Sequence, residues 1–380
     1  MTGSPFPGCV PELTDGVVLL RAHRLDDAQR IVEQSNDPES MRWTTVPRPY
    51  GLDDAREFLA TIESAWNSPD GLRYWAVTDA SDPQGRYLGT IDLRPRGGGV
   101  GEVGFGLHPQ GRGSGFMAGA LRLLARWWFG QGGVRVHWLA IRGNFPSWRV
   151  AWSCGFTQHG TTPQVHPDPD DAGAPPLDVW RASLGADDVL EPHSPWDDVP
   201  VLEVAEHGIR LRPWRDGDLA SLDPRDQPDH HMPARGVLDA DTFPEWLLIR
   251  REQMSVGRVL SWCVADATTD AALGEVLVFV TEGTLDDDTA ELGYQVVPSA
   301  RRRGVATTGA RRLVAHALTP RSEGGLGMRR LVAQTADDNV ASNAVLDRLG
   351  FTIWGQETAA DVLPDGRAVD ALHWELLREG

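Results

Sequence analysis

The sequence predicts an α/β protein of two tandem domains, each a mixed (α+β) sheet flanked by helices. Its 380 residues exceed what one ordinary hydrophobic core needs. The same series of short segments occurs twice along the chain. In each copy, several strands follow one another before a glycine-rich turn and a long helix. This order excludes the strand–helix alternation of a Rossmann fold.

The duplication is visible in three pairs of segments. "GVVLLRAHRLDDAQ" (16–29) resembles "HGIRLRPWRDGDLA" (207–220), "GEVGFGLHP" (101–109) resembles "AELGYQVVP" (290–298), and "GNFPSWRVAWSCGF" (143–156) resembles "DNVASNAVLDRLGF" (338–351). An acidic, proline-bearing stretch without periodicity, "LGADDVLEPHSPWDDVP", separates the copies. We therefore expect domains at 1–186 and 204–380, joined by a linker at 187–203.

The elements follow the same order in both copies. A strand ends at Arg21 or Arg212, and an acidic helix start and one or two helices come next. Two strands (73–78 and 87–93; 259–265 and 273–280), a third strand, the glycine-rich turn and a long helix follow. A strand, a helix ending at Gly-Phe and closing strands near "LDVWRASL" and "ALHWELL" complete each copy.

Composition excludes several functions. A formal charge of −18 argues against nucleic acid as a partner, and no apolar run is long enough for a transmembrane helix. The N-terminus lacks the features of a secretion signal, and the three cysteines are scattered, so we expect a reducing cytoplasm. The basic residues are all arginine, which excludes lysine chemistry. The pair His230–His231 has no partners at ligand spacing, so we expect no metal.

The glycine-rich turns, "RGSGFM" (112–117) and "RRRGVA" (301–306), each lie between a strand and a helix. Free amides and the helix dipole make such a turn an anion site. Copy one allows two registers, Gln110-x-x-Gly113-x-Gly115 or Arg112-x-x-Gly115-x-Met117. The second is favoured because Gly115 and Gly304 then follow Glu102 and Glu291 at equal spacing. The alternative is a plain helix-capping turn with arginines facing solvent.

The strand with a glutamate, R-x-x-G-x-A, the helix, and then N-x-x-S and Gly-Phe together resemble the GNAT superfamily of acetyl-CoA-dependent N-acetyltransferases. Copy one is similar to the RimJ/RimL type, including its acceptor-side segment, "NDPESMRWTTVPRPYGLDDAREFL" (36–59). Copy two departs from that type at 222–243, so its acceptor pocket is expected to differ. The resemblance covers about nine-tenths of the chain. It implies, in each copy, a mostly antiparallel sheet with a splayed parallel pair that holds the pantetheine arm.

The resemblance also implies cofactor-binding residues for acetyl-CoA, the acyl donor. The loops would hold its pyrophosphate, and Met117, where glycine or alanine is usual, would narrow the first loop. Asn144 and Asn339 would contact the CoA arm, although asparagine is also an ordinary helix cap. The implied set is Arg112, Gly113, Ser114, Gly115, Met117, Asn144, Arg301, Arg302, Arg303, Gly304, Val305, Ala306 and Asn339.

The implied reaction is direct attack of an amine on the thioester. Glu102 and Glu291 stand where the family often has its general base; the alternative is a solvated strand carboxylate. The family's usual acid, a tyrosine seven residues after the asparagine, is replaced by Ala151 and Leu346. The serines of N-x-x-S, Ser147 and Ser342, are then the candidates that protonate or hydrogen-bond the leaving thiolate.

We therefore predict an N-acetyltransferase that acts on a primary amine of a small molecule, such as an antibiotic or another cationic metabolite, or on a peptide N-terminus. The alternatives are an acetyl-CoA-binding regulatory module without turnover and a transferase that uses another acyl-CoA. Because GNAT domains often dimerise, the two copies are expected to pair within a monomer, or the chain forms a homodimer. The sequence does not identify a silent half.

Overall fold

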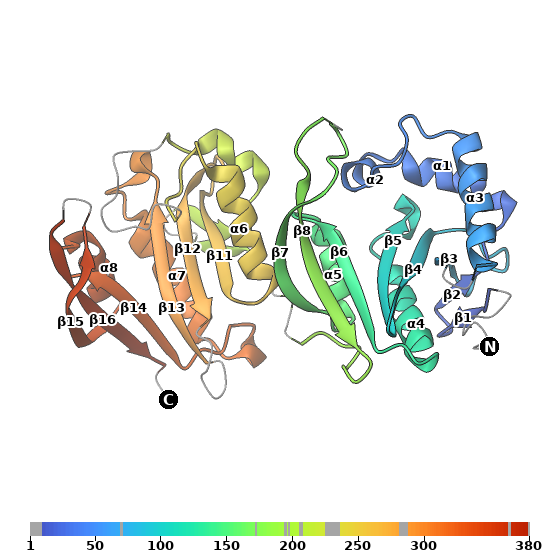
Figure 1. Ribbon diagram of the computed structural model, residues 1–380. Helices are drawn as coiled ribbons and strands as arrows, with labels where there is room; N and C mark the ends of the chain where they lie inside the picture. Colours follow the sequence, from blue (N-terminus) through green and yellow to red (C-terminus); the bar gives the residue numbers. More distant parts are fainter. Residues whose placement is uncertain are drawn as a thin grey trace. The chain divides into compact units, whose positions relative to one another are not determined.

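The protein is described here by a computed structural model that covers residues 10–68, 71–171, 173–193, 196, 198–204, 208–224, 236–280, 288–363 and 366–378. The chain divides into two compact units, Met1–His193 (unit 1) and Ser194–Gly380 (unit 2). Each unit contains one eight-stranded mixed sheet with helices beside it (Figure 1). The predicted fold class is therefore confirmed, whereas the domain limits at 1–186, 187–203 and 204–380 stay a prediction.

Unit 1 has the sheet order β1-β2-β3-β4-β5-β6-β8-β7. Between the strand that ends at Arg21 and the strand that begins at Arg73, the sequence predicted one or two helices, and unit 1 has three. Its elements are β1 (Leu13–Thr14), β2 (Val18–Arg21), α1 (Ala28–Ser35), α2 (Pro38–Trp43), α3 (Leu52–Trp66), β3 (Arg73–Asp79), β4 (Gly89–Gly97), β5 (Val100–Leu107), α4 (Phe116–Gly130), β6 (Arg135–Ile141), α5 (Phe145–Ser153), β7 (Thr157–His166) and β8 (Leu177–Gly185).

Unit 2 repeats this order as β9-β10-β11-β12-β13-β14-β16-β15. Its elements are β9 (Leu202–Val204), β10 (Ile209–Arg212), α6 (Phe243–Ser255), β11 (Val259–Asp266), β12 (Ala272–Val280), β13 (Thr289–Val296), α7 (Val305–Leu318), β14 (Arg330–Ala336), α8 (Val340–Arg348), β15 (Thr352–Val362) and β16 (Ala368–Leu377). A 3-10 helix, Asp216–Ser221, stands where the sequence predicted an acidic helix start.

Helices cover both faces of the unit 1 sheet. A side chain at Gly101 would meet Trp128 of α4, whereas one at Gly106 would meet Gln34 of α1. Positions 101 and 106 of one strand point to opposite faces, so α4 and α1 lie on opposite sides of the sheet. Helix α3 buries Ala55, Leu59, Ile62 and Trp66, which recur at helical spacing along one stripe. Its Phe58 ring lies 5.8 Å from that of Tyr74 on β3, centroid to centroid.

A buried ion pair recurs at the start of both units. Arg21 at the end of β2 donates to both carboxylate oxygens of Asp27, at 2.8 and 2.7 Å. Arg212 at the end of β10 holds Asp218 in the same way, at 2.9 and 2.6 Å. All four side chains are nearly fully buried. These bidentate pairs fix the segments that follow β2 and β10.

Candidate functional site

Each unit contains one pair of parallel strands that pair only at their beginnings. β5 and β6 pair from Val100 to Val103, and β13 and β14 pair from Thr289 to Glu291. Beyond these registers, no pairing joins the two strands of either pair. This is the splayed parallel pair that the sequence analysis expected. β5 and β13 then lead through short 3-10 helices, Pro109–Gly111 and Pro298–Ala300, to the glycine-rich turns.

The two turns have the same backbone conformation. Gly113 and Gly115 have φ of 76° and 77°, and Arg302 and Gly304 have φ of 61° and 78°. Arg302 therefore adopts in unit 2 a left-handed conformation that a glycine adopts in unit 1, at a cost of about 1–2 kcal/mol. An added Cβ would meet no atom within 4 Å at Gly113 or Gly115. The space over the unit 1 turn is open to a ligand.

Backbone amides at the turns are available to an anion. The first intrahelical hydrogen bonds of α4 and α7 run from Gly119 N to Gly115 O and from Thr308 N to Gly304 O. The N–H groups of the preceding residues of α4 and α7 thus have no intrahelical acceptor. Both helices span at least 14 residues and add their dipoles. These features fit the pyrophosphate of a bound nucleotide.

The arginines that begin the turns already have partners within the protein. The N–H of Arg112 donates to Pro109 O and that of Arg301 to Pro298 O, each at 3.2 Å, so the free amides begin one residue later. The Arg112 guanidinium is also engaged, because it donates to Asp37 Oδ2 at 2.6 Å and to Ser40 Oγ at 3.0 Å. Arg112 ties the turn to the start of α2 through Nη2, and its part in holding the pyrophosphate stays a prediction.

The remaining predicted loop residues divide by exposure. Ser114, Arg302 and Arg303 are exposed, and their side chains can reach an anion above the turn. Met117, expected to narrow the first loop, is only 2% exposed and packs into the core, so the expectation is corrected. Val305 is likewise buried, and Ala306 is half-buried. For these last three, the predicted role is left to their backbone amides.

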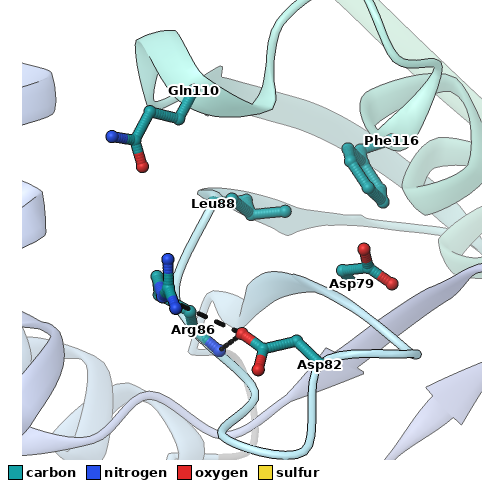
Figure 2. A pocket seen from close by; sticks show the side chains of 6 residues that line it. All are labelled: Asp79, Asp82, Arg86, Leu88, Gln110 and Phe116. Carbon is teal, nitrogen blue, oxygen red and sulfur yellow. Dashed lines mark hydrogen bonds and ion pairs between the residues drawn. The ribbon is translucent and has the colours of Figure 1, made fainter.

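A pocket of about 310 Å³ lies beside the unit 1 turn (Figure 2). Phe116 and Gln110 form one side of it, and Asp79, Asp82, Arg86 and Leu88 form the other. The Arg86 guanidinium lies 3.9 Å from Asp82, which also accepts the Arg86 N–H at 3.1 Å. Two carboxylates beside one arginine make a poor site for pyrophosphate, so we do not assign the anion to this pocket.

Asn144 and Asn339 cap the helices that follow the splayed strands. The Oδ1 atom of Asn144 accepts from Ser147 N and that of Asn339 from Ser342 N, each at 3.1 Å. The capping alternative raised by the sequence is therefore correct. Within the described residues, the Nδ2 group of neither asparagine has a hydrogen-bond partner. Both side chains can cap a helix with one end and donate to a ligand with the other.

The two predicted serines have different partners. Ser147 Oγ accepts from Trp138 Nε1 at 3.1 Å. Ser342 Oγ lies 2.9 Å from the hydroxyl of Tyr294, which stands on the splayed part of β13. Burial raises the pKa of Tyr294, and the hydrogen bond to Ser342 opposes the shift, so its hydroxyl stays protonated. The equivalent residue in unit 1 is Phe105, so only unit 2 has this pair of hydroxyls.

Tyr294 was not predicted, because the expected position for a tyrosine was seven residues after the asparagine, where unit 2 has Leu346. The signal was present in the aligned segments "GEVGFGLHP" and "AELGYQVVP", where phenylalanine and tyrosine occupy one position. The tyrosine reaches the helix from the facing strand.

The two predicted glutamates have unlike surroundings. Glu102 accepts from Arg96 Nη2 at 2.8 Å and lies 3.6 Å from Arg94 Nη1. Glu291 has no ion pair within the described residues, and burial raises its pKa although His373 opposes the shift. Both residues lie on the paired beginning of the strand, before the opening.

A third carboxylate, Asp92 on β4, was also missed. Burial raises its pKa to about 6; Arg94 opposes this shift and Glu102 adds to it. The sequence marked 87–93 only as a strand, and no local pattern distinguishes a buried aspartate there from an exposed one.

Other expectations concern metals and membranes. The His230–His231 pair lies outside the described residues. Among the residues that the structure describes, no three His, Cys, Asp or Glu side chains gather where they could hold a metal ion. In the same part of the chain, no helix combines the length and apolar character that a membrane crossing requires.

The Acetyltransferase (GNAT) domain family matches the chain twice, at residues 18–157 and 209–352. The chain therefore belongs to the GNAT acetyltransferases. It is an acyltransferase with two tandem domains, of a family that binds acetyl-CoA and carries out acetyl-CoA-dependent N-acetylation. The turns described above fit the pyrophosphate of that donor.

Solved structures of GNAT proteins resemble single units of the chain. RimJ of Mycobacterium smegmatis, solved with CoA-disulfide, is 15% identical, with a TM-score of 0.41 over 48% of this chain and 90% of its own. The ribosomal-protein-S5-alanine acetyltransferase of Vibrio fischeri is 18% identical, with a TM-score of 0.40 over 47% and 97%. The microcin C7 self-immunity acetyltransferase MccE, solved with acetyl-CoA and AMP, is 16% identical, with a TM-score of 0.40 over 48% and 98%. Comparison with curated proteins finds no match.

Proposed function

We propose that the protein transfers the acetyl group of acetyl-CoA to a primary amine of a cationic small molecule or a peptide N-terminus. The observation that carries the proposal is the backbone anion site at the end of each splayed parallel pair. Such a site can hold the pyrophosphate while the pantetheine arm lies between the strands. Acetyl-CoA then supplies a thioester carbonyl that the amine attacks directly.

The residues take the following roles in this proposal. The amides from Gly113 and Arg302 onward hold the pyrophosphate, and the exposed Arg302 and Arg303 side chains add positive charge to the second site. The Nδ2 groups of Asn144 and Asn339 donate to the CoA arm. Glu102 and Glu291 as bases, and Ser147 and Ser342 as donors to the leaving sulfur, stay predictions.

The acceptor follows from two features of the chain. The segment at 36–59 resembles the RimJ/RimL type, which supports a peptide N-terminus, and the charge of −18 is compatible with a cationic metabolite. An α-amine with a pKa near 8 costs only about 1–1.5 kcal/mol to deprotonate at pH 7, against about 4–5 kcal/mol for a lysine-like amine. A carboxylate of ordinary basicity therefore serves an α-amine most easily.

The test is an acetyl-transfer assay with the full chain. Release of CoA is followed with a thiol reagent over alanyl and seryl peptides, a polyamine and an aminoglycoside. Mass spectrometry must show one added acetyl group on the amine that is consumed. Acetyl-CoA binding without transfer to any of these amines would favour a regulatory module without turnover. Turnover only with a different acyl-CoA would favour a transferase that uses another acyl donor.

A further inference from the structure

The unit 1 sheet carries a polar face made by Tyr74, Asp92, Arg94 and Glu102, together with Gly104. Tyr74 of β3 pairs with Asp92 of β4, which pairs with Gly104 of β5. Cross-strand partners point to the same face of a sheet, so these three residues form one row across it. The ring of Phe58 on α3 packs edge-on against Tyr74 above the same face.

The Asp92 carboxylate is buried yet only partly engaged. Asp92 is 7% exposed, and its Oδ1 atom accepts from Arg94 Nε at 3.2 Å. Within the described part of the chain, its Oδ2 atom has no hydrogen-bond partner. A Cβ at Gly104 would lie 2.7 Å from Oδ2, so only glycine there leaves this oxygen its place. Oδ2 of Asp92 can therefore accept a hydrogen bond from a ligand, and the neighbouring position on β5, Gly104, has no side chain.

Gly104 lies where β5 and β6 separate. Pairing of β5 with β6 ends at Val103, so Gly104 begins the free part of β5, along which the thioester would lie. Glu102 precedes the opening and is held by Arg94 and Arg96. Asp92 is therefore better placed than Glu102 to meet an amine that approaches the thioester across this face.

Unit 2 fills the equivalent space. The strand registers place Leu277 opposite Gly293 and Glu275 opposite Gln295, where unit 1 has Asp92 opposite Gly104 and Thr90 opposite Gly106. Glu275 is fully buried. Its two oxygens accept from Arg250 at 2.7 and 3.2 Å, from Ser261 at 2.7 Å and from Gln295 at 2.7 Å. Each of its oxygens is satisfied by protein groups, and none is left for an amine.

We infer that Asp92 binds the ammonium group of the acceptor and takes its proton, so that acetyl transfer takes place in unit 1. The inference rests on the proposed function. The ammonium gives one proton to Asp92, and the amine nitrogen forms a C–N bond with the thioester carbon. The C–S bond breaks, CoA leaves as the thiolate, and the excess proton of the amide nitrogen is passed to that sulfur. Acetyl-CoA and the amine yield an N-acetyl amine and CoA.

The surroundings of Asp92 suit a base that works near neutral pH. The charged and titratable groups that face it are Arg94 on its own strand, Glu102 on β5 and Tyr74 on β3. Burial and Glu102 raise the basicity of the carboxylate, and Arg94 limits the rise. A carboxylate that protonates near pH 6 matches an α-amine acceptor better than an ordinary aspartate does.

The experiment compares Asp92→Asn with wild type on whichever amine of the acetyl-transfer assay has the highest kcat/KM. We expect kcat/KM to fall by about 100-fold or more. Calorimetry should give an unchanged acetyl-CoA affinity, and the inflection of kcat/KM near pH 6 should disappear. The matched control is Asp187→Asn, the same change at an exposed carboxylate in the turn that follows β8, outside the acceptor-side segment and the glycine-rich turns. This control should keep the wild-type profile.

A second variant keeps the inference testable if the first is poorly folded. Gly104→Ala places a methyl group against Asp92 and should raise KM for the amine more than the Kd of acetyl-CoA. Asp92→Asn with kcat/KM within threefold of wild type, or with the inflection intact, would overturn the inference. A wild-type protein that binds acetyl-CoA but acetylates no amine would instead overturn the proposed function. The two failures are therefore distinguishable.

Discussion

A glutamate at Gly115 tests the backbone anion site with little risk of a steric artefact. The residue has φ of 77°, and an added Cβ meets no atom within 4 Å. The left-handed conformation costs a non-glycine residue about 1–2 kcal/mol, whereas a carboxylate at a helix N-terminus returns about 0.3–1 kcal/mol. We expect the free energy of unfolding of Gly115→Glu to fall by no more than about 1.7 kcal/mol.

The effect on the ligand should be larger. Two unit charges 4 Å apart repel by about 4 kcal/mol at an effective dielectric constant of 20. The turn is exposed, so screening should halve this figure, and about 2 kcal/mol corresponds to an affinity loss of about 30-fold. Gly115→Ala carries the conformational cost without the charge and should change the Kd of acetyl-CoA by less than fivefold.

Calorimetric titration of acetyl-CoA into wild type, Gly115→Glu, Gly304→Glu and Gly115→Ala measures these differences. Two sites in wild type, each weakened by its own glutamate, would show that both turns hold the donor. Thermal unfolding of each variant serves as the check on folding. If Gly115→Glu and Gly115→Ala bind equally well, the phosphates do not lie at this turn and the reasoning fails.

Three further changes have defined outcomes. The raised pKa of Asp92 means that ionising it costs stability, a penalty absent below about pH 4 and complete above about pH 6. Asp92→Asn should therefore stabilise the protein by about 1–3 kcal/mol at pH 7.5 and by less at pH 5, as measured by denaturant unfolding. Arg250→Met leaves Glu275 buried without its only charged partner among the described residues and should cost about 3–5 kcal/mol in the same assay, most of which a second change, Glu275→Leu, should restore. Arg302→Gly removes the left-handed strain and should raise the unfolding free energy by about 1 kcal/mol, while calorimetry shows severalfold weaker acetyl-CoA binding in unit 2.

The parts of the protein that depend on local sequence were predicted well. The turns were found from glycine positions and equal spacing, because left-handed backbone and free helix amides arise within a few residues of chain. The pairing of Arg112 with Asp37 could not be found in this way, because 75 residues separate the two. The burial of Met117 depends on how α4 is rotated against the sheet, and the six-residue motif does not contain that information.

The two halves differ most where side chains, and not the backbone, make the site. At the turns, Gly113 of unit 1 corresponds to Arg302 of unit 2, yet both backbones have nearly the same conformation, since the anion site is built from amides. On the polar face, Leu277 in place of Asp92 removes the free carboxylate, because no backbone group can take its part in accepting a proton. On the inference that Asp92 takes the proton, both halves keep the predicted donor turn and only unit 1 has this carboxylate. The motifs of the turns do not show this difference between the two units, because it depends on which residues are cross-strand partners in each sheet.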